Sequence, residues 1–206
     1  QQYRSTCPDQ QDSQKSLSDQ SQFRCLTVVM FAIVDCETTG FGKHDRIVEI
    51  AAVVVDETDG SVVDEYDTLV NPQRDTGPVG VHGVTASMVE AAPSFEEVAA
   101  ALAFRLDGAV LVAHNLSFDA RMLRQEYERL DADFDEGRGH CTLRLTSENL
   151  EAACARYGIV LEGHHRALAD ARATSELLRR VLDDAADGIP AAVGTEHLPL
   201  SPRTLR

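Results

Sequence analysis

The chain contains no tryptophan, and aromatic residues make up only 5% of its 206 residues. A large surface of stacked aromatic rings is therefore not expected. No run of about eighteen or more apolar residues occurs, so neither a transmembrane helix nor a membrane partner is predicted. The N-terminal segment lacks the basic start, the apolar stretch and the cleavage site of a secretory signal. These absences favour a cytoplasmic location.

Cysteine is scarce, odd in number and never spaced as in a CxxC metal site. The cysteines are Cys7, Cys25, Cys36, Cys141 and Cys154. We expect free thiols in a reducing compartment, where disulfides are rare.

Basic residues are in the minority: 19 Lys and Arg face 34 Asp and Glu, which gives a formal net charge of −15. This balance argues against a protein that coats nucleic acid through a basic surface. It is compatible with an enzyme that gathers metal ions, because bound cations invert the local field. Binding to nucleic acid is expected to be weak unless a partner protein holds the nucleic acid.

The chain divides into a polar tail over residues 1–29, a patterned domain over 30–186 and a C-terminal tail over 187–206. Apolar runs predict strands, and helical periodicity with capping residues predicts helices. The expected strands are Phe31–Val34, Arg46–Asp56, Ser61–Val70 and Ala109–Ala113, the first three as an antiparallel meander. The expected helices are residues 95–106 capped by Ser94, Ser117–Leu130 capped by Ser117, Ser147–Tyr157 ended by Gly158, and Arg166–Ala186, with a loop over Asn71–Gly83. This order predicts an α/β fold with a mixed sheet flanked by helices.

The first chemical signal is the pair Asp35 and Glu37 after an apolar strand. Residues two apart share one face of a strand, so Cys36 should point the other way, toward the core. Paired acids are costly there unless a cation lies between them. A solvated strand end is the alternative in so acidic a chain. Thr38 and the turn that follows it suit a nucleotide end.

Asp119 is the second signal. It lies in the first turn of a predicted helix, where the helix dipole favours a negative group, so an ordinary first-turn acid is the alternative. The polar residues His114 and Asn115, however, directly follow a buried strand. Such positions often line the ligand cleft of an α/β sheet.

The third signal is His165 followed five residues later by Asp170 on the last helix. A helix-entry histidine and an exposed acid are the alternative. Together the three signals suit phosphodiester hydrolysis, in which two cations about 4 Å apart activate water and stabilise the leaving oxygen. Oxygen ligands suit Mg²⁺ or Mn²⁺, and a histidine can take the proton of the water.

The order DxETTG, HNxxFD and HxxxxD resembles the DEDDh, or DnaQ-like, exonucleases, which include the proofreading epsilon subunit of bacterial DNA polymerase III and RNase T. The resemblance implies an RNase H-like fold and two Mg²⁺ or Mn²⁺ ions held by Asp35, Glu37, Asp119 and Asp170. It also implies His165 as general base, since the spacing to the last Asp selects it over His164. The DEDDy group would need Tyr at position 166, which is Arg here.

Further matches implied by the resemblance concern the substrate. The segment VGVHGVT looks like a family loop in which Val81 and His82 contact the terminal nucleotide, with loop packing as the alternative for Val81. Thr38, Asn115 and Phe118 would complete that pocket. CTLRL also matches, but the stretch between it and the next helix is short, which leaves substrate preference open.

Three functions are compatible with these motifs. The first is a 3′→5′ exonuclease on single-stranded or frayed DNA ends, either free-standing or as the proofreading subunit of a DNA polymerase. The second is an RNase T-like exonuclease on RNA ends. The third is an inactive module that docks on a polymerase, although all the acids and the histidine are present here.

Overall fold

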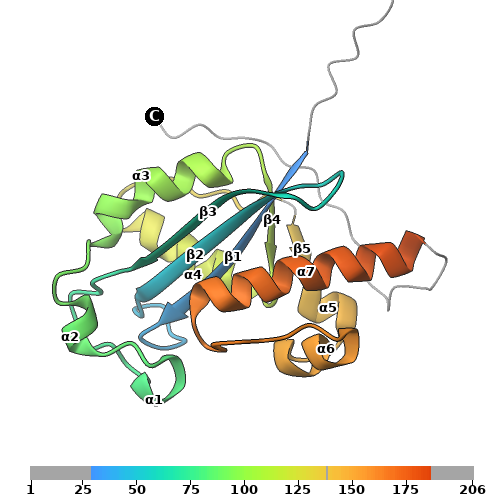
Figure 1. The fold of residues 1–206 in the computed structure, drawn as a ribbon. Coiled ribbons are helices and arrows are strands. Elements are labelled where there is room, and N and C mark those ends of the chain that lie inside the picture. The colour runs from blue at the N-terminus through green and yellow to red at the C-terminus, as the bar shows by residue number, and fades with distance from the viewer. Residues whose placement is uncertain (1–28, 138, 187–206) are drawn as a thin grey trace, which may run out of the picture.

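The protein is described here by a computed structural model, which covers residues 29–137 and 139–186. A mixed five-stranded sheet in the order β3-β2-β1-β4-β5 forms its centre (Figure 1). The strands are β1 (Met30–Thr38), β2 (Ile47–Asp56), β3 (Val62–Leu69), β4 (Val110–Ala113) and β5 (Gly139–Cys141). β1 to β3 form the predicted antiparallel meander, and β4 and β5 add in parallel. The predicted mixed sheet is thus confirmed.

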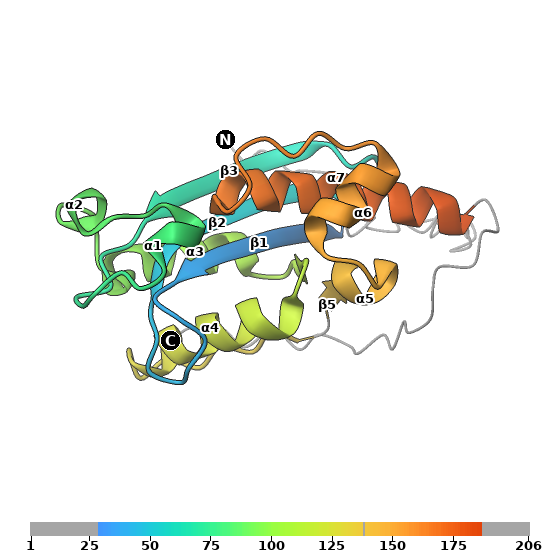
Figure 2. The same ribbon diagram turned by 90° about the horizontal axis from the view of Figure 1, so that it is seen from below.

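Helices cover both faces of this sheet. The helices are α1 (Val79–His82), α2 (Ala86–Val89), α3 (Phe95–Leu106), α4 (Leu116–Glu128), α5 (Thr142–Thr146), α6 (Leu150–Tyr157) and α7 (Ala167–Ala186). Figure 2 shows α7 on one side of β1 and α4 on the other. The short helices α1 and α2 lie at one end of the sheet, and α1 forms inside the segment predicted to be a loop.

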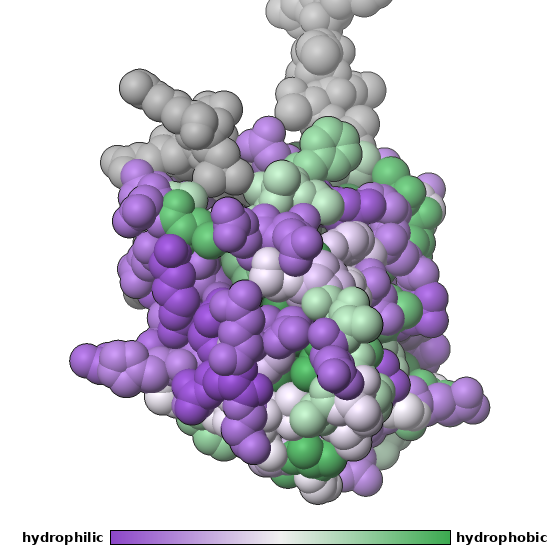
Figure 3. All heavy atoms as spheres, turned by 90° about the vertical axis from the view of Figure 1, so that its left-hand side faces the viewer, coloured by the Kyte–Doolittle hydropathy of each residue, from purple (hydrophilic) through white to green (hydrophobic). Residues whose placement is uncertain are grey.

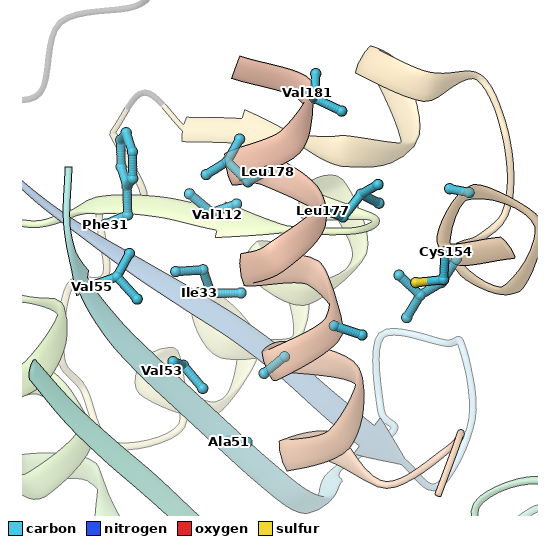
Figure 4. Close-up of a cluster of buried hydrophobic side chains, with 14 of the residues drawn as sticks. Phe31, Ile33, Ala51, Val53, Val55, Val112, Cys154, Leu177, Leu178 and Val181 are labelled. Atoms are coloured by element: carbon cyan, nitrogen blue, oxygen red, sulfur yellow. The ribbon is translucent and has the colours of Figure 1, made fainter. Parts of the chain in front are cut away.

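Two apolar cores follow from the alternation of side chains along β1 and β2. Residues such as Ile33 and Val53 pack with Leu177 and Leu178 under α7 (Figure 4). The residues between them, such as Val34 and Ala52, face α3 and α4. Because β2 is buried on both faces, its sequence IVEIAAVVVD is almost continuously apolar.

Two helix starts differ from the prediction. α4 begins at Leu116 with Asn115 at the cap position, and the Ser117 hydroxyl donates to Asn115 Oδ1 at 3.1 Å instead of capping the helix. α6 begins only at Leu150, where the Asn149 side chain accepts from Ala152 N. Ser147 instead ends α5 in a left-handed conformation. Serine and asparagine cap helices about equally well, so residue type alone could not decide either start.

Within the described residues, Cys36, Cys141 and Cys154 are free thiols, as predicted, whereas Cys7 and Cys25 lie outside this range. No helix in the described part of the chain is long and apolar enough to cross a membrane. The side where α1, α2 and α3 lie in Figure 1 is mainly hydrophilic, with only separate hydrophobic patches (Figure 3). The two predicted tails, over residues 1–29 and 187–206, fall almost wholly outside the described range.

Candidate active site

The candidate site lies where β4 ends beside β1. The parallel ladder between these strands runs only to Ile33 and Val112, whereas β1 continues to pair with β2 as far as Thr38. The second half of β1 therefore has a hydrogen-bonded neighbour on one edge only. Since unpaired backbone donors in a protein interior need partners, this open edge favours an approach by polar side chains.

Asp35 and Glu37 lie on the open half of β1 and point to the same face as Ile33, toward α7. Asp170, from the first turn of α7, meets them there. One carboxylate oxygen from each of these three residues lies within 4.8 Å of the others, close enough to bind one metal ion. The fold thus brings Asp35 and Asp170 together although they are 135 positions apart in the sequence.

Asp119 approaches the open edge of β1 from α4. Its Oδ1 accepts hydrogen bonds from Cys36 N and Cys36 Sγ, both at 3.2 Å. The side chain of Cys36 is buried on the opposite face from Asp35, as predicted. Asp119 itself is only 3% exposed. The backbone donor that β4 leaves unpaired is therefore satisfied by a buried carboxylate.

Burial and mutual repulsion make this group of acids hard to ionise. Burial is the main cause that raises the pKa of Asp35 well above its usual value, with Asp119 and Asp170 adding to the shift. Burial also raises the pKa of Glu37 to about 7, helped by Asp170, and that of Asp119 to about 7. Closely spaced hard oxygen donors that repel one another are suited to a divalent cation such as Mg²⁺ or Mn²⁺.

Two histidines stand beside Asp170. His164 Nδ1 lies 3.0 Å from both Asp170 oxygens, and the backbone N of His165 donates to Asp170 Oδ2 at 3.1 Å. The exposed ring of His165 stacks on that of His164, with centroids 3.8 Å apart. His165 adopts a left-handed backbone with φ of 65°. Both rings are thus adjacent to the acids, and His164 makes the direct side-chain contact.

The loop that contains α1 places the side chains of Val81 and His82 differently. Val81 is 54% exposed, but His82 is only 2% exposed. The His82 Nδ1 accepts from Val84 N at 3.0 Å, so Nε2 carries the proton and donates to Thr76 O at 3.2 Å. Burial lowers the pKa of this ring, which is consistent with its neutral form. The His82 side chain thus braces the loop, and only Val81 presents its side chain at the surface.

The same loop touches the end of β1 at Gly77. This residue has φ of 79°, and a Cβ added to it would lie 2.2 Å from the Thr39 carbonyl oxygen. Only glycine allows so close a backbone approach. The contact fixes the distance between the loop that carries Val81 and the strand that carries the acids.

The other predicted substrate residues lie around the same strand end. Thr38 is buried, and its hydroxyl donates to Gly40 O at 2.8 Å. Asn115 is exposed at the start of α4, and the half-buried Phe118 packs against Phe41, with ring centroids 5.7 Å apart. Sequence reasoning missed Phe41, which is 79% exposed. An apolar ring directly after the TTG turn was the signal that could have identified it.

Comparison with known proteins agrees with this geometry. A family profile described as exonuclease, RNase_T, matches residues 32–178. The PolC-type DNA polymerase III of Thermotoga maritima is 34% identical over 82% of this chain, and the DNA polymerase III subunit epsilon-like protein of Rhodobacter capsulatus is 36% identical over 76%. The chain spans only 13% and 24% of these two relatives, respectively.

Solved structures extend the comparison. A structure of exonuclease X in complex with 5′ overhanging duplex DNA is 30% identical, with a TM-score of 0.61, and the match covers 78% of this chain and 95% of that one. Escherichia coli exonuclease I with a dT13 oligonucleotide shares the fold, with a TM-score of 0.65 at 19% identity. The chain therefore belongs to the RNase T exonuclease family, as a 3′→5′ exonuclease domain of the DnaQ-like DEDDh type.

Proposed function

We propose that the protein removes nucleotides one at a time from the 3′ end of single-stranded or frayed DNA and releases nucleoside 5′-monophosphates. The observation that carries the proposal is the convergence of Asp35, Glu37 and Asp170 within 4.8 Å, with Asp119 at the adjacent strand edge. Two buried and two partly buried acids in one place are unfavourable without a counter-charge. Their oxygen donors fit a pair of Mg²⁺ or Mn²⁺ ions, with these four residues as the ligands.

When bound, such ions lower the pKa of water and stabilise the charge on the leaving oxygen. His165 accepts the proton of the attacking water, because its ring is exposed and adjacent to Asp170. The raised pKa values of Glu37 and Asp119 mean that a cation must displace protons from these carboxyls near neutral pH.

The 3′-terminal nucleotide binds between the strand end and the loop of α1. Thr38 and Asn115 offer polar groups there, and Val81, Phe118 and Phe41 offer apolar surface. His82 supports the loop from beneath. Aromatic rings at such a position suit stacking of an unpaired base, which is tolerant of base identity.

DNA is favoured over RNA because the relatives above are a DNA polymerase, a DNA polymerase III subunit epsilon-like protein and a DNA-bound exonuclease. The net charge of −15 leaves little general attraction for a polyanion, which favours a polymerase catalytic subunit that holds the DNA. A free-standing exonuclease is the alternative. A pull-down from native extract that recovers a replicative polymerase subunit would support the first arrangement.

The chemistry is tested with matched 5′-labelled DNA and RNA oligonucleotides in the presence of Mn²⁺. Asp35→Ala should reduce nucleotide release to background, whereas the control Glu57→Ala, at an exposed acid in the β2–β3 turn, should match the parent. Faster degradation of the RNA would correct the substrate. Equal rates for Asp35→Ala and the parent would refute the mechanism, and an inactive parent would favour a docking module.

A further inference from the structure

Glu49 is a further buried acid beside the proposed metal ligands. It lies on β2 directly opposite Glu37 in the antiparallel register, and its side chain is only 1% exposed. Directly opposed residues of two antiparallel strands project to the same face. Glu49 therefore adds a like charge next to a group that already contains Glu37, Asp35 and Asp170, and its role there needs an explanation.

Both oxygens of Glu49 are fully occupied by the start of α7. Arg166 Nε donates to both of them at 3.0 Å, and Arg166 Nη2 donates to Oε1 at 2.6 Å. The backbone N of Ala167 donates to Oε2 at 3.3 Å. A carboxylate engaged in this way by a guanidinium fork and a helix N-terminus is poorly placed to bind a cation as well. Glu49 is accordingly not a metal ligand.

These bonds matter for the site because Arg166 lies in the chain between His165 and Asp170. It follows His165 directly, and its carbonyl accepts a hydrogen bond from Asp170 N at 3.1 Å. His165 itself has a left-handed backbone, a conformation that costs energy for a residue with a side chain. A restraint on Arg166 therefore acts on the proposed base on one side and on the last metal ligand on the other.

From these contacts we infer that Glu49 and Arg166 form a positioning pair. The pair holds the first turn of α7 over β1 and β2, so that Asp170 stays within reach of Asp35 and Glu37 and His165 keeps its left-handed turn. This inference rests on the proposed exonuclease function. It explains why an arginine precedes α7 and binds Glu49 on β2. Arg166 itself takes no part in the chemistry.

A matched control exists on the same helix. Arg172 and Glu65 join α7 to β3 through two bonds of 2.8 and 2.6 Å, about one and a half turns further along, and touch none of the proposed ligands. This pair has the same chemistry and joins the same helix to the sheet. It differs from the Glu49 pair mainly in its distance from the site and its greater exposure.

The test compares Glu49→Gln with Glu65→Gln in the full chain. Glu49→Gln should lower kcat for a DNA oligonucleotide by about 10–100-fold and weaken Mn²⁺ binding, measured by calorimetry, by a similar factor, as loss of a supporting bond behind metal ligands does. KM should change little. Glu65→Gln should match the parent in all three quantities. A folded Glu49→Gln protein with parental kcat and Mn²⁺ affinity would overturn the inference.

Arg166→Lys provides a second variant if Glu49→Gln does not fold. Lysine keeps the charge but loses the planar fork, so the fold should persist while kcat and Mn²⁺ affinity fall by about tenfold. Parental values for a folded Arg166→Lys protein would also overturn the inference. If the parent binds Mn²⁺ but releases no nucleotide, the proposed function fails, and Mn²⁺ affinity alone still tests the pair.

Discussion

The two halves of β1 differ in every respect that matters for the site. The first half, Met30 to Val34, is apolar and is paired with β2 on one edge and, over Phe31 to Ile33, with β4 on the other. The second half, from Asp35, carries two acids and is paired only with β2. One strand thus supplies both residues at the centre of the core and two of the converging acids.

This difference shows that the early end of β4 creates the site. If β4 continued further, it would pair with the backbone of Cys36, and Asp119 would lose its hydrogen bond from Cys36 N. The acids of the second half therefore suit bound cations. Without cations they lower the stability of the folded protein, because like charges close together repel one another. The first half should govern stability and the second half activity.

The largest expected effect is that of Asp119→Asn in the second half. Nucleotide release should fall to background, because a proposed metal ligand is lost, while the Cys36 N–H keeps an acceptor. The metal-free variant should melt at a higher temperature than the metal-free parent, since a buried acid with a raised pKa is replaced by a neutral group. Activity and melting would be measured on the same preparations. A variant that melts lower than the parent in EDTA would contradict the assigned cost.

His165→Ala should have the next largest effect, a decrease in kcat of about 10²–10⁴-fold, the range for loss of a general base. His164→Ala tests the assignment, because His164 makes the direct contact with Asp170. We expect a smaller decrease for His164→Ala, measured with saturating Mn²⁺. The reverse order would move the role of the base to His164.

Phe31→Ala tests the first half of the strand. Phe31 is buried under α7 and stacks edge-on against His140, with centroids 5.6 Å apart. Its truncation should cost about 3–5 kcal/mol of the free energy of unfolding, measured with urea. The rate of nucleotide release per folded molecule should stay near the parental value at low temperature. A large loss of activity in the folded variant would show that the two halves are coupled.

The smallest expected effect is on pH dependence. The folded-state pKa values of Glu37 and Asp119 are raised to about 7, so the metal-free folded protein binds more protons than the unfolded chain below that pH. Its stability should fall as pH rises through about 7, with a melting temperature a few degrees higher at about pH 6 than at about pH 8 in EDTA. Saturating Mn²⁺ should reduce or reverse this difference. The same change of melting temperature with pH in the presence and absence of Mn²⁺ would contradict this prediction.

Much of the fold was predictable because its patterns are local. The apolar runs of β1 and β2 and the capping residue Ser94 gave elements close to those observed. The helix starts at Leu116 and Leu150 were missed, since several capping residues stood in a row. The end of β4 was predicted correctly. That Asp119 then accepts the unpaired Cys36 N–H depends on the order of the strands, which no local sequence pattern contains.

The candidate site residues were proposed from motif order, whereas the contacts that support them were not predicted. Nothing near Glu49 in the sequence indicates that it binds Arg166, which is 117 positions away. Likewise, the burial of His82 depends on how its loop folds back on Thr76. Residues that carry chemistry form short recognisable motifs, whereas residues that hold them depend on three-dimensional packing.

Gly77 has a consequence for the spacing between the loop that carries Val81 and the end of β1. Because the loop meets the Thr39 carbonyl backbone to backbone, the gap between Val81 and β1 cannot be tuned gradually by exchanging side chains at this contact. Even a methyl group at position 77 would push the loop away from the end of β1 in one step. Under the proposed function, the missing Cβ of Gly77 therefore helps to set the space available to the 3′ end of the substrate.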